Sequence, residues 1–461
     1  MAEPKLLAGL KIRRLRRQTG LTQAAMAEAL GISASYLNLI ERNQRPVSAA
    51  LLVALAERFD FDPRSLAAAE PGGGEAALRR RLADPIFADL EIDRAELAEW
   101  LAAAPGGAEA FARAYDRLAG AVPAAAAPGD PISAVRAQIE RWRGHFADLD
   151  AAAEALADEL RLGAADLYGA IAERLRVKHQ LSLRILPVEV MPDALRRLDL
   201  HARQLQLSEL LDPASRAFAA AYQLALIEAR GEIDALVRGA AFADRAAERL
   251  YRRHLASYFA AALIMPYARF LRACEATGYD IELLQRRFGA GFEQVAHRLT
   301  TLQRVGARGL PFFMLRIDRA GQVSKRFAGA SAAPLAEADG GCPLWAVHGA
   351  FEKRGALVVQ LVAIEEGGRW LTMARSVTPQ GRRYGTLAAE FAVVLGVSAE
   401  LATTLAAARG IDLGGEAAPI GLGCRRCHRP ACPQRSLPPL GRALLVREQE
   451  RGLSPLDFAG G

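Results

Sequence analysis

The pattern that most limits what this chain can fold into lies in residues 22–45, "TQAAMAEALGISASYLNLIERNQR". Thr22 is suited to cap a helix that begins at Gln23. Gly31 can close that helix, and Ser33 can cap the next one. Two short helices joined by such a turn make a helix-turn-helix, whose second helix presents its first turn to the DNA major groove. The stretch therefore predicts a helix-turn-helix within an N-terminal bundle of five helices.

The second helix of this pair divides into an inner and an outer face. Leu37 and Ile40 are expected to face the core, which leaves hydroxyl and amide side chains free to read base edges. Nearby arginines are placed to meet phosphates, which supply salt-dependent affinity and not specificity. The candidate DNA contacts are Arg13, Arg14, Ser33, Ser35, Tyr36, Asn38, Arg42 and Arg45. The alternative is a small helical bundle with a solvated basic face.

About residues 8–67 resemble the phage-repressor-like helix-turn-helix family, through "LTQAAMAEALGIS" and "SYLNLIERNQRP". The resemblance implies that Gln23 and residues 33–38 face DNA. Modules of this kind usually bind near-palindromic sites as dimers, so we expect a homodimer on a double-stranded DNA operator.

Length and composition are those of a multidomain globular protein. At 461 residues the chain is long enough for about two to four domains, and its hydrophobic (51%) and charged (24%) fractions are globular. No apolar run reaches the roughly 18 residues of a membrane span, and the start lacks a signal-peptide core. We therefore expect a cytoplasmic protein with no membrane contact. The net charge of +7 permits an anionic partner.

Composition and periodicity divide the chain into four parts. Breaks are expected at "AAAEPGGGE", "APGG" and "AVPAAAAPGDP", with amphipathic helices such as "AELAEWLAAA" between them. The expected parts are a helix-turn-helix domain at 1–68, a helical linker or dimerisation region at 69–150, an α+β domain at 151–308 and a C-terminal α+β domain at 309–461. The expected fold class is therefore mainly α with α+β.

Extended segments are predicted in two places. A strand pair is predicted from "LSLRILPVEVM" and "LRRLDLHARQLQLSELL", before a helix that Asp212 caps and that ends just before Gly231. After "RVGARGLP" the period changes to two, which predicts an antiparallel sheet with hairpins turning at residues 319–321 and 366–368. A further helix is expected at about residues 386–408.

The middle of the chain resembles the metallopeptidase-like domain of the ImmA/IrrE type, through the strand pair, "SRAFAAAYQLALIE" and "LASYFAAALIMP". In catalytic relatives the first helix carries His-Glu-x-x-His, which supplies two zinc ligands and a general base. The matching positions here are Tyr222, Gln223 and Leu226, which can neither hold zinc nor ionise a water. We therefore expect a degenerate domain with no catalytic residue. His254, which follows two arginines, is expected at the surface.

The first predicted hairpin combines cations with two aromatic rings. Within "GARGLPFFMLRIDRAGQVSKRF" these residues are Arg308, Phe312, Phe313, Arg316, Arg319, Lys325 and Arg326. Paired aromatics with converging cations suit an elongated ligand with an apolar end and a phosphorylated end. The alternative is that the aromatics lie in the core and the charges lie in water.

The last third of the chain is similar to the C-terminal domain of the short-chain fatty acyl transcriptional regulators, through "RGLPFFMLRIDRAGQVSKR", "GGCPLWAVHGAF" and "PIGLGCRRCHRPACPQRSLPPL". That family joins the same three modules in this order. The resemblance implies a ligand-sensing domain and a transcription regulator that senses a short-chain acyl-CoA, such as propionyl-CoA or acetyl-CoA, and controls genes of its metabolism. The candidate ligand-binding residues are Arg308, Phe312, Phe313, Arg316, Lys325, Arg326, Trp345 and His348.

Clustered cysteines near the end of the chain suggest a metal site. The candidate ligands are Cys342 and, with the spacing C-x2-C-x4-C, Cys424, Cys427 and Cys432. Four thiolates would make a closed structural zinc site, and His428 or His348 could instead complete it. An iron-sulfur cluster would use the same thiolates, and reduced packed cysteines are the remaining alternative. Cys274 stands apart and is expected in the core.

Two other functions compete with an acyl-CoA-sensing regulator. A regulatory metallopeptidase would need a water-activating site, which the matching helix does not provide. A redox regulator acting through the cysteines predicts that peroxide, and not an acyl-CoA, alters DNA binding.

Overall fold

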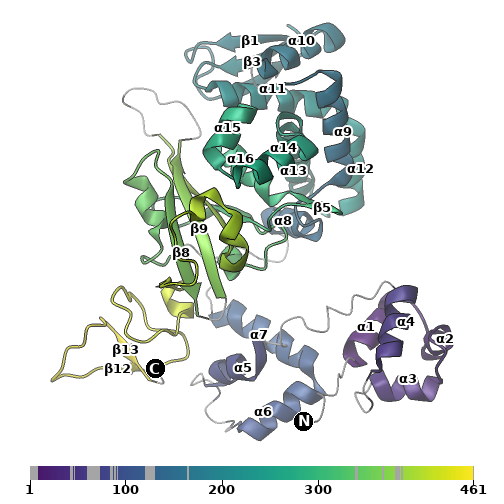
Figure 1. Cartoon of the computed structure of the whole chain (residues 1–461), viewed down its shortest axis with the longest axis vertical. Coiled ribbons are helices and arrows are strands. Elements are labelled where there is room, and N and C mark those ends of the chain that lie inside the picture. The colour runs from purple at the N-terminus through teal and green to yellow at the C-terminus, as the bar shows by residue number, and fades with distance from the viewer. Residues whose placement is uncertain are drawn as a thin grey trace. The chain divides into compact units, whose positions relative to one another are not determined.

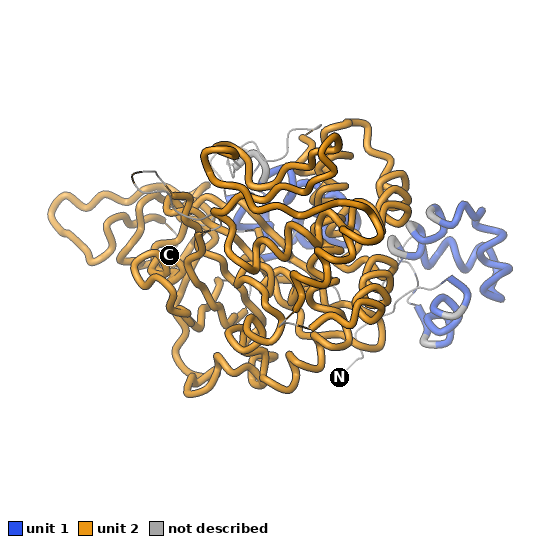
Figure 2. Tube along the Cα trace, turned by 90° about the horizontal axis from the view of Figure 1, so that it is seen from above, with its two compact units in different colours: residues 1–117 blue, residues 118–461 orange. Residues whose placement is uncertain are grey.

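The chain divides into two compact units, residues 1–117 and residues 118–461, which Figure 2 shows in blue and orange. Helices make up the described elements of the first unit and the start of the second, and the larger sheet forms later in the chain (Figure 1). This confirms the expected class, mainly α with α+β. The computed structural model describes residues 9–41, 45, 47–59, 73–83, 87, 90, 92–119, 130–163, 166–337, 341–365, 368–378, 385 and 388–459.

Four short helices begin the described chain. They are α1 Gly9–Gln18, α2 Gln23–Ala29, α3 Ala34–Glu41 and α4 Ala49–Phe59. The Thr22 side chain accepts a hydrogen bond from the amide of Ala25, and the Ser33 side chain accepts one from the amide of Tyr36. Gly31 has a φ of 67°, in the left-handed region that ends a helix. The predicted helix-turn-helix is confirmed, while the expected fifth helix falls among residues outside the described part.

The core of this bundle is small and apolar. Its fully buried members include Ile12, Met26, Leu37, Ile40 and Leu55. The prediction that Leu37 and Ile40 face the core is therefore confirmed.

Three further helices belong to the first unit. They are α5 Gly74–Leu82, α6 Arg94–Ala103 and α7 Pro105–Ala119. The last begins at the "APGG" segment, where we expected a loop. That prediction is wrong, because Pro105 stands at the first helical position, where its missing N–H group needs no partner.

Nine helices are described in the second unit. They are α8 Pro131–Arg141, α9 Ala147–Glu159, α10 Leu167–His179, α11 Pro213–Glu228, α12 Arg230–Ala240, α13 Arg245–Ile264, α14 Tyr267–Thr277, α15 Ile281–Phe288 and α16 Phe292–Thr300. Long α13 contacts α8, α9, α11 and α12 and is buried along most of its length. Small residues such as Ala220 and Ala256 let α11 and α13 pack closely.

A three-stranded sheet precedes α11. Its strands, β1 Ser182–Leu186, β2 Arg196–Asp199 and β3 Gln204–Ser208, have the order β1-β3-β2. Strand β3 pairs in parallel with β1 and antiparallel with β2. The predicted extended segments and the Asp212 cap of α11 are confirmed. Gly231 was expected just beyond this helix, but α11 ends at Glu228 and Gly231 lies in the first turn of α12.

A six-stranded sheet forms the C-terminal part of the second unit. Its strands are β6 Phe313–Ile317, β7 Val323–Phe327, β8 Val358–Ile364, β9 Gly368–Val377, β10 Phe391–Ser398 and β11 Ala418–Ile420. Their order is β11-β8-β9-β10-β6-β7, and all pairs except β11 with β8 are antiparallel. Both predicted hairpins, β6 with β7 and β8 with β9, are confirmed.

Strand β10 occupies a segment that we predicted to be helical, residues 386–408. That prediction is wrong from Phe391 onward, and short 3-10 helices follow at Ala399–Thr404 and Ala406–Ala408. The strand lies between β9 and β6, and its residues from Ala392 to Leu395 are fully buried. A strand covered on both faces lacks the alternation that identifies a half-buried strand, so periodicity alone did not distinguish it from a helix.

The two faces of this sheet belong to different cores. Met314, Leu371 and Leu395 pack with the helices of the second unit. Phe313 and Trp370 face the other way, toward the 3-10 helix Ala346–Phe351. The sheet is therefore fixed to the helical part through a shared core.

The C-terminal segment consists mostly of loops. It includes the short strands β12 Leu444–Leu445 and β13 Asp457–Phe458. The two-residue strands β4 Gln303–Arg304 and β5 Ala307–Arg308 lie earlier, before β6.

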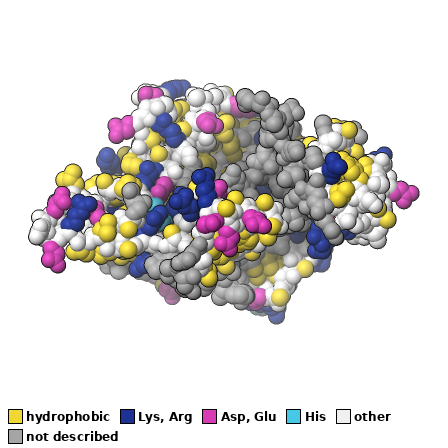
Figure 3. Space-filling model, turned by 90° about the horizontal axis from the view of Figure 1, so that it is seen from below, with side chains coloured by type: hydrophobic (Ala, Val, Ile, Leu, Met, Phe, Trp, Pro, Cys, Tyr) yellow, Lys and Arg dark blue, Asp and Glu magenta, His cyan; other side chains and the backbone are white. Residues whose placement is uncertain are grey.

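On the face drawn in Figure 3, Lys and Arg side chains lie beside Asp and Glu side chains. None of the helices that the structure describes is long and apolar enough to cross a membrane.

Candidate functional site

The predicted DNA contacts of the first unit differ in exposure. Arg13, Ser35 and Arg45 are exposed, as a surface that meets DNA requires. Tyr36 and Asn38 are half-buried, and Tyr36 packs against the core of the bundle. Arg42 and the side chain of Arg14 lie outside the described residues, and the hydroxyl of Ser33 is used in capping α3.

A partly buried polar network around Glu41 joins the three helices at the predicted contact surface. The Gln23 amide donates to Asn38 Oδ1 at 3.3 Å and to Glu41 Oε2 at 2.9 Å. Arg16 Nε donates to Glu41 Oε1 at 2.6 Å. Burial alone would raise the pKa of Glu41, but the hydrogen bonds from Arg16 and Gln23 outweigh it and lower that pKa. The network fixes α2 and α3 relative to α1, and sequence reasoning did not find Arg16 or Glu41.

A cavity of about 290 Å³ opens in the second unit between α8, α13, α16 and β7. Its apolar lining comes from Ile132, Val135, Ile139, Val323 and Phe327, and its cations are Arg136, Lys325 and Arg326. A pocket with an apolar wall and a few charged groups is the usual form of a small-molecule site. Because α8 supplies one wall and the edge strand β7 another, the pocket depends on the contact between them.

The three cations at this cavity have carbonyl or carboxylate partners. Lys325 Nζ lies 2.5 Å from Glu293 Oε1, and Arg326 Nη1 donates to the carbonyl of Ala336 at 2.9 Å. Arg136 forms ion pairs with Glu140 and Glu337. These partners hold the cations in place before any ligand arrives, so that a phosphate would meet positioned donors.

Two histidines line the same cavity beside Phe327. The His297 ring centroid lies 4.4 Å from that of Phe327, and the His254 ring stacks on the same phenylalanine at 5.9 Å. Burial lowers the pKa of His254 to about 4 and lowers the pKa of His297 as well, so both rings are neutral at pH 7. His254 Nε2 has no hydrogen-bond partner among the described residues. The expectation of a surface position for His254 is wrong, because its helix turns it inward between Phe146 and Phe327.

The structure separates the predicted ligand-binding residues. Lys325 and Arg326 line the cavity, whereas Phe312 and Phe313 are fully buried in opposite cores. Phe312 lies immediately before β6 and Phe313 is the first residue of that strand, and their rings enter different cores, so neither lines the cavity.

The remaining predicted ligand residues lie elsewhere. Arg316 donates to Ser324 and stacks on Phe391, while Trp345 is buried and donates to Thr372. Arg308 is exposed on β5, and His348 is half-buried in the 3-10 helix Ala346–Phe351. Sequence reasoning missed Arg136, His254, His297 and Phe327, because three different helices and a strand bring them together.

The helix that resembles a peptidase helix carries an arginine contact in place of metal chemistry. Arg196 on β2 donates from Nη1 to Gln223 Oε1 at 2.7 Å. Its guanidinium carbon also lies 4.4 Å from the ring centroid of Tyr222. The residue one turn later, Leu226, packs against the core. None of these side chains on α11 offers a zinc ligand or a general base.

The four candidate metal ligands come together around one cavity of about 20 Å³. They are Cys342, Cys424, Cys427 and Cys432, and all are reduced. Within the described residues, no group of three or more His, Cys, Asp or Glu side chains is arranged to hold a metal ion. Burial raises the pKa of the Cys427 thiol, which is the behaviour of a packed thiol. Cys274 is fully buried elsewhere, as predicted.

A buried arginine organises the cysteine segment. Arg435 is 3% exposed, and it donates to the carbonyls of Arg429 at 2.6 Å and Cys427 at 3.2 Å. Its guanidinium carbon lies 4.8 Å from the ring centroid of Phe458. Sequence reasoning did not find this structural role.

Family models match three consecutive parts of the chain. The model of a helix-turn-helix domain matches residues 7–69, and that of the IrrE N-terminal-like domain matches residues 176–300. The model of the short-chain fatty acyl coenzyme A regulator, C-terminal, matches residues 301–456.

Full-length relatives are also similar. The HTH-type transcriptional regulator RamB of Mycobacterium tuberculosis is 36% identical over 469 residues, which cover 98% of each chain. The propionyl-CoA carboxylase regulator of Cereibacter sphaeroides is 39% identical over 465 residues, covering 98% of this chain and 99% of its own. A solved structure of a Mycobacterium tuberculosis transcriptional regulator has a TM-score of 0.67 and 36% identity, and covers 71% of this chain and 99% of that one.

Proposed function

The chain belongs to the family of short-chain fatty acyl coenzyme A transcriptional regulators, and we propose that the cavity beside β7 is where it senses propionyl-CoA or acetyl-CoA. In this proposal a homodimer binds its operator through α2 and α3 of each copy. The effector changes operator affinity and so controls genes of short-chain acyl metabolism. The family assignment confirms the resemblance inferred from the sequence.

The observation that carries the proposal is the composition of that cavity. Coenzyme A ends in phosphates at one side and in a thioester with a short apolar chain at the other. Arg136, Lys325 and Arg326 can meet phosphates, and the side chains around Phe327 can cover the acyl chain. A cavity of about 290 Å³ suits the acyl end, with the nucleotide lying over the cations at its mouth.

Neutral histidines suit the polar middle of such a ligand. A thioester carbonyl and the pantetheine amides are uncharged, and a neutral imidazole can donate to or accept from them without the cost of burying a charge. His254 and His297 remain neutral at pH 7 because burial lowers their pKa values.

The position of α8 supplies a route from effector to DNA. This helix is the first described element of the second unit, and it follows the segment that leads from the first unit. Ligand bound between α8 and β7 favours one position of α8. It therefore favours one direction for the segment that precedes α8 and connects to the first unit. Effector and operator then act on the same equilibrium, and each alters the affinity of the other.

The proposed function includes no catalytic step. Tyr222, Gln223 and Leu226 offer no hydrolytic site, so the function is recognition.

We further propose that the four cysteines stabilise the C-terminal segment. The hypothesis to be tested is that they do so by binding a structural zinc ion. The chemistry of four thiols around one cavity supports this, although their described arrangement is that of packed thiols.

Isothermal titration of the full chain with propionyl-CoA, acetyl-CoA and free CoA tests the proposal. Lys325→Ala combined with Arg326→Ala should weaken acyl-CoA binding by about tenfold or more, since charge-assisted contacts to phosphate are each worth about 1.5 to 3 kcal/mol. Arg308→Ala is the matched control, because Arg308 is an exposed arginine of the same domain that does not line the cavity. Equal loss in both variants, or acyl-CoA binding that leaves operator affinity unchanged, would contradict the proposal.

A further inference from the structure

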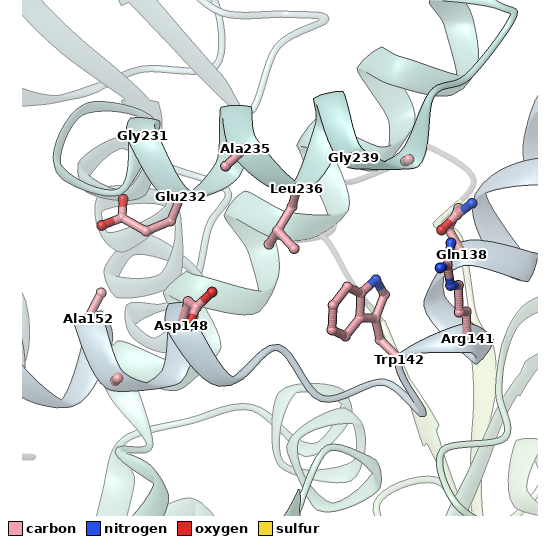
Figure 4. Close-up of a pocket in the computed structure, with 12 residues that line it drawn as sticks. Gln138, Arg141, Trp142, Asp148, Ala152, Gly231, Glu232, Ala235, Leu236 and Gly239 are labelled. Atoms are coloured by element: carbon pink, nitrogen blue, oxygen red, sulfur yellow. The ribbon is translucent and has the colours of Figure 1, made fainter. Parts of the chain in front are cut away.

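A second and larger hollow lies on another side of the second unit, between α8, α9 and α12. It has a volume of about 800 Å³ and is a groove open to solvent. Figure 4 shows α12 running along one side of it and the end of α8 with the start of α9 along the other. This groove shares no lining residue with the proposed effector cavity. We refer to it below as the α12 groove.

Small residues form part of the floor of the α12 groove, beside Leu236. Gly231, Ala235 and Gly239 follow one another at intervals of four, and therefore lie along one face of α12. A side chain added at Gly231 or Gly239 would meet nothing within 4 Å, so the space above the helix backbone is open. Ala151 and Ala152 of α9 leave similar space opposite. A bulky side chain from outside can enter here.

One end of the groove carries a bulky aromatic residue. Trp142 follows α8 and is 47% exposed, although its ring lies only 6.1 Å from that of Phe146. Figure 4 places Trp142 at the end near Gly239, and Ala152 and Gly231 at the opposite end. The groove thus has an aromatic ring at one end, and glycine and alanine positions beside Asp148 and Glu232 at the other.

Charges are divided between the same two ends. Arg141 lies beside Trp142, whereas Asp148 and Glu232 lie at the end that holds Gly231 (Figure 4). Within the described part of the chain, none of these three side chains has an ion-pair partner. One end of the groove therefore presents an exposed aromatic ring and an unpaired cation. The other end presents unpaired anions beside small residues, so the two ends are complementary in shape and in charge.

We propose that the α12 groove is the surface through which two copies of this chain form a dimer. A two-fold rotation exchanges the ends of the groove, so that Trp142 of each copy enters the space above Gly231 of the other. The same rotation sets Arg141 of each copy against Glu232 of the other. Every contact is therefore made twice, as an interface between identical surfaces requires. Buried Trp and Arg are also the residues that most often carry interface energy.

The charges of the groove favour a second copy over other occupants. Asp148 and Glu232 repel nucleic acid, and an uncharged apolar helix would leave Arg141 and both carboxylates without partners. A second copy supplies Glu232 as the partner of Arg141, and Arg141 as the partner of Glu232. This inference goes beyond the effector and operator functions, because it concerns where the subunits meet.

Sedimentation equilibrium of the full chain, over a range of concentrations, tests the proposed interface. Trp142→Ala should weaken dimerisation by about tenfold or more, as expected on truncation of an aromatic side chain that the interface buries. Arg141→Glu and Glu232→Arg should each weaken it, because each sets like charges together. The double variant Arg141→Glu with Glu232→Arg should restore the dimer to within about threefold of the unaltered chain. Arg409→Glu is the matched control, since Arg409 is an exposed arginine that does not line the groove.

Three results would overturn the inference. The first is that the unaltered chain is a monomer at all concentrations. The second is that it forms a dimer whose dissociation constant none of the groove variants changes. The third is that the double variant dimerises no more tightly than either single variant. Propionyl-CoA titration of each variant shows whether the second unit is intact. Loss of dimerisation with unchanged acyl-CoA binding supports the interface, while a dimer that binds no acyl-CoA contradicts only the effector proposal.

Discussion

The carboxylate of Asp150 on α9 and the guanidinium of Arg298 on α16 lie 2.6 Å apart, although the two residues are 148 positions apart in the sequence. Both side chains are almost fully buried, at 0% and 1% exposed. Tyr258 of α13 donates to the second oxygen of the same carboxylate at 2.6 Å. Three helices of the second unit therefore meet at one buried ion pair whose hydrogen-bonding capacity is well satisfied.

Removal of one partner from this pair should destabilise the second unit strongly. Asp150→Asn leaves the Arg298 charge buried without a counter-ion, and such changes cost about 3 to 5 kcal/mol in the free energy of unfolding. Urea denaturation followed by circular dichroism measures the effect. Asp158→Asn is the control, because that carboxylate is on the same helix but 76% exposed, so its ion pair with Arg269 should contribute at most about 1 kcal/mol.

Asp150 should also make stability depend on pH in strongly acidic solution. Burial alone would raise the pKa of Asp150, but the Arg298 charge and the hydrogen bonds to the carboxylate lower it to about 2. The stabilisation is therefore complete above the unfolded pKa near 4, and is lost as the pH falls toward 2. The Asp150→Asn variant should lack this loss, which unfolding measurements at pH 4 and pH 2.5 would detect.

His254 should make the free energy of unfolding depend on pH in a less acidic range than Asp150 does. Burial lowers its pKa to about 4, whereas an unfolded histidine titrates near 6.5, so the unfolded state binds a proton first as the pH falls. The free energy of unfolding should fall by up to about 3 kcal/mol between pH 7 and pH 4 from this residue. His254→Phe should flatten that part of the curve. An unchanged slope would mean that His254 is not buried as a neutral ring.

The C-terminal segment should depend on Arg435 more than on other arginines near it. Arg435→Lys keeps the charge, but it cannot reach several carbonyls at once, because lysine lacks the planar fork. We expect limited proteolysis to cut the segment after residue 420 at least several-fold faster in this variant. Arg451→Lys is the matched control, because that arginine is exposed. Equal cleavage of both variants would contradict the structural role.

Metal content separates the alternatives for the cysteines. If the four thiols hold a structural zinc ion, elemental analysis of the purified chain should find about one zinc per subunit, lost in Cys432→Ser and retained in Cys274→Ser. Iron with sulfide would indicate a cluster, and absence of metal from the unaltered chain would leave packed thiols. Operator binding before and after peroxide treatment tests the redox alternative in the same variants.

Local signals predicted much of this fold. The caps at Thr22, Ser33 and Asp212 act over two or three residues, so that the sequence around each is sufficient to define it. The hairpins were predictable for the same reason, since their turns are short. Strand β10 was not, because its burial on both faces is set by β6 and β9, which lie elsewhere in the sequence.

The candidate effector site was predictable only in part. Lys325 and Arg326 stand in a motif of the hairpin, and their charge pointed to a phosphate ligand. Phe312 and Phe313 carried the same signal, but Phe312 lies just before β6 and Phe313 begins it, and the two rings are buried in different cores. His254 and Arg136 gave no local signal at all, since their role depends on how α13 and α8 pack against β7.

The contact of Arg196 with α11 limits any attempt to build a hydrolytic zinc site on this helix. Replacing Tyr222, Gln223 and Leu226 with His, Glu and His would restore the motif, yet a divalent ion drawn there would meet the fixed positive charge of Arg196. Hydrolysis would therefore require changes in the strand as well as in the helix. A scan for the helix motif alone detects only the first of these two obstacles.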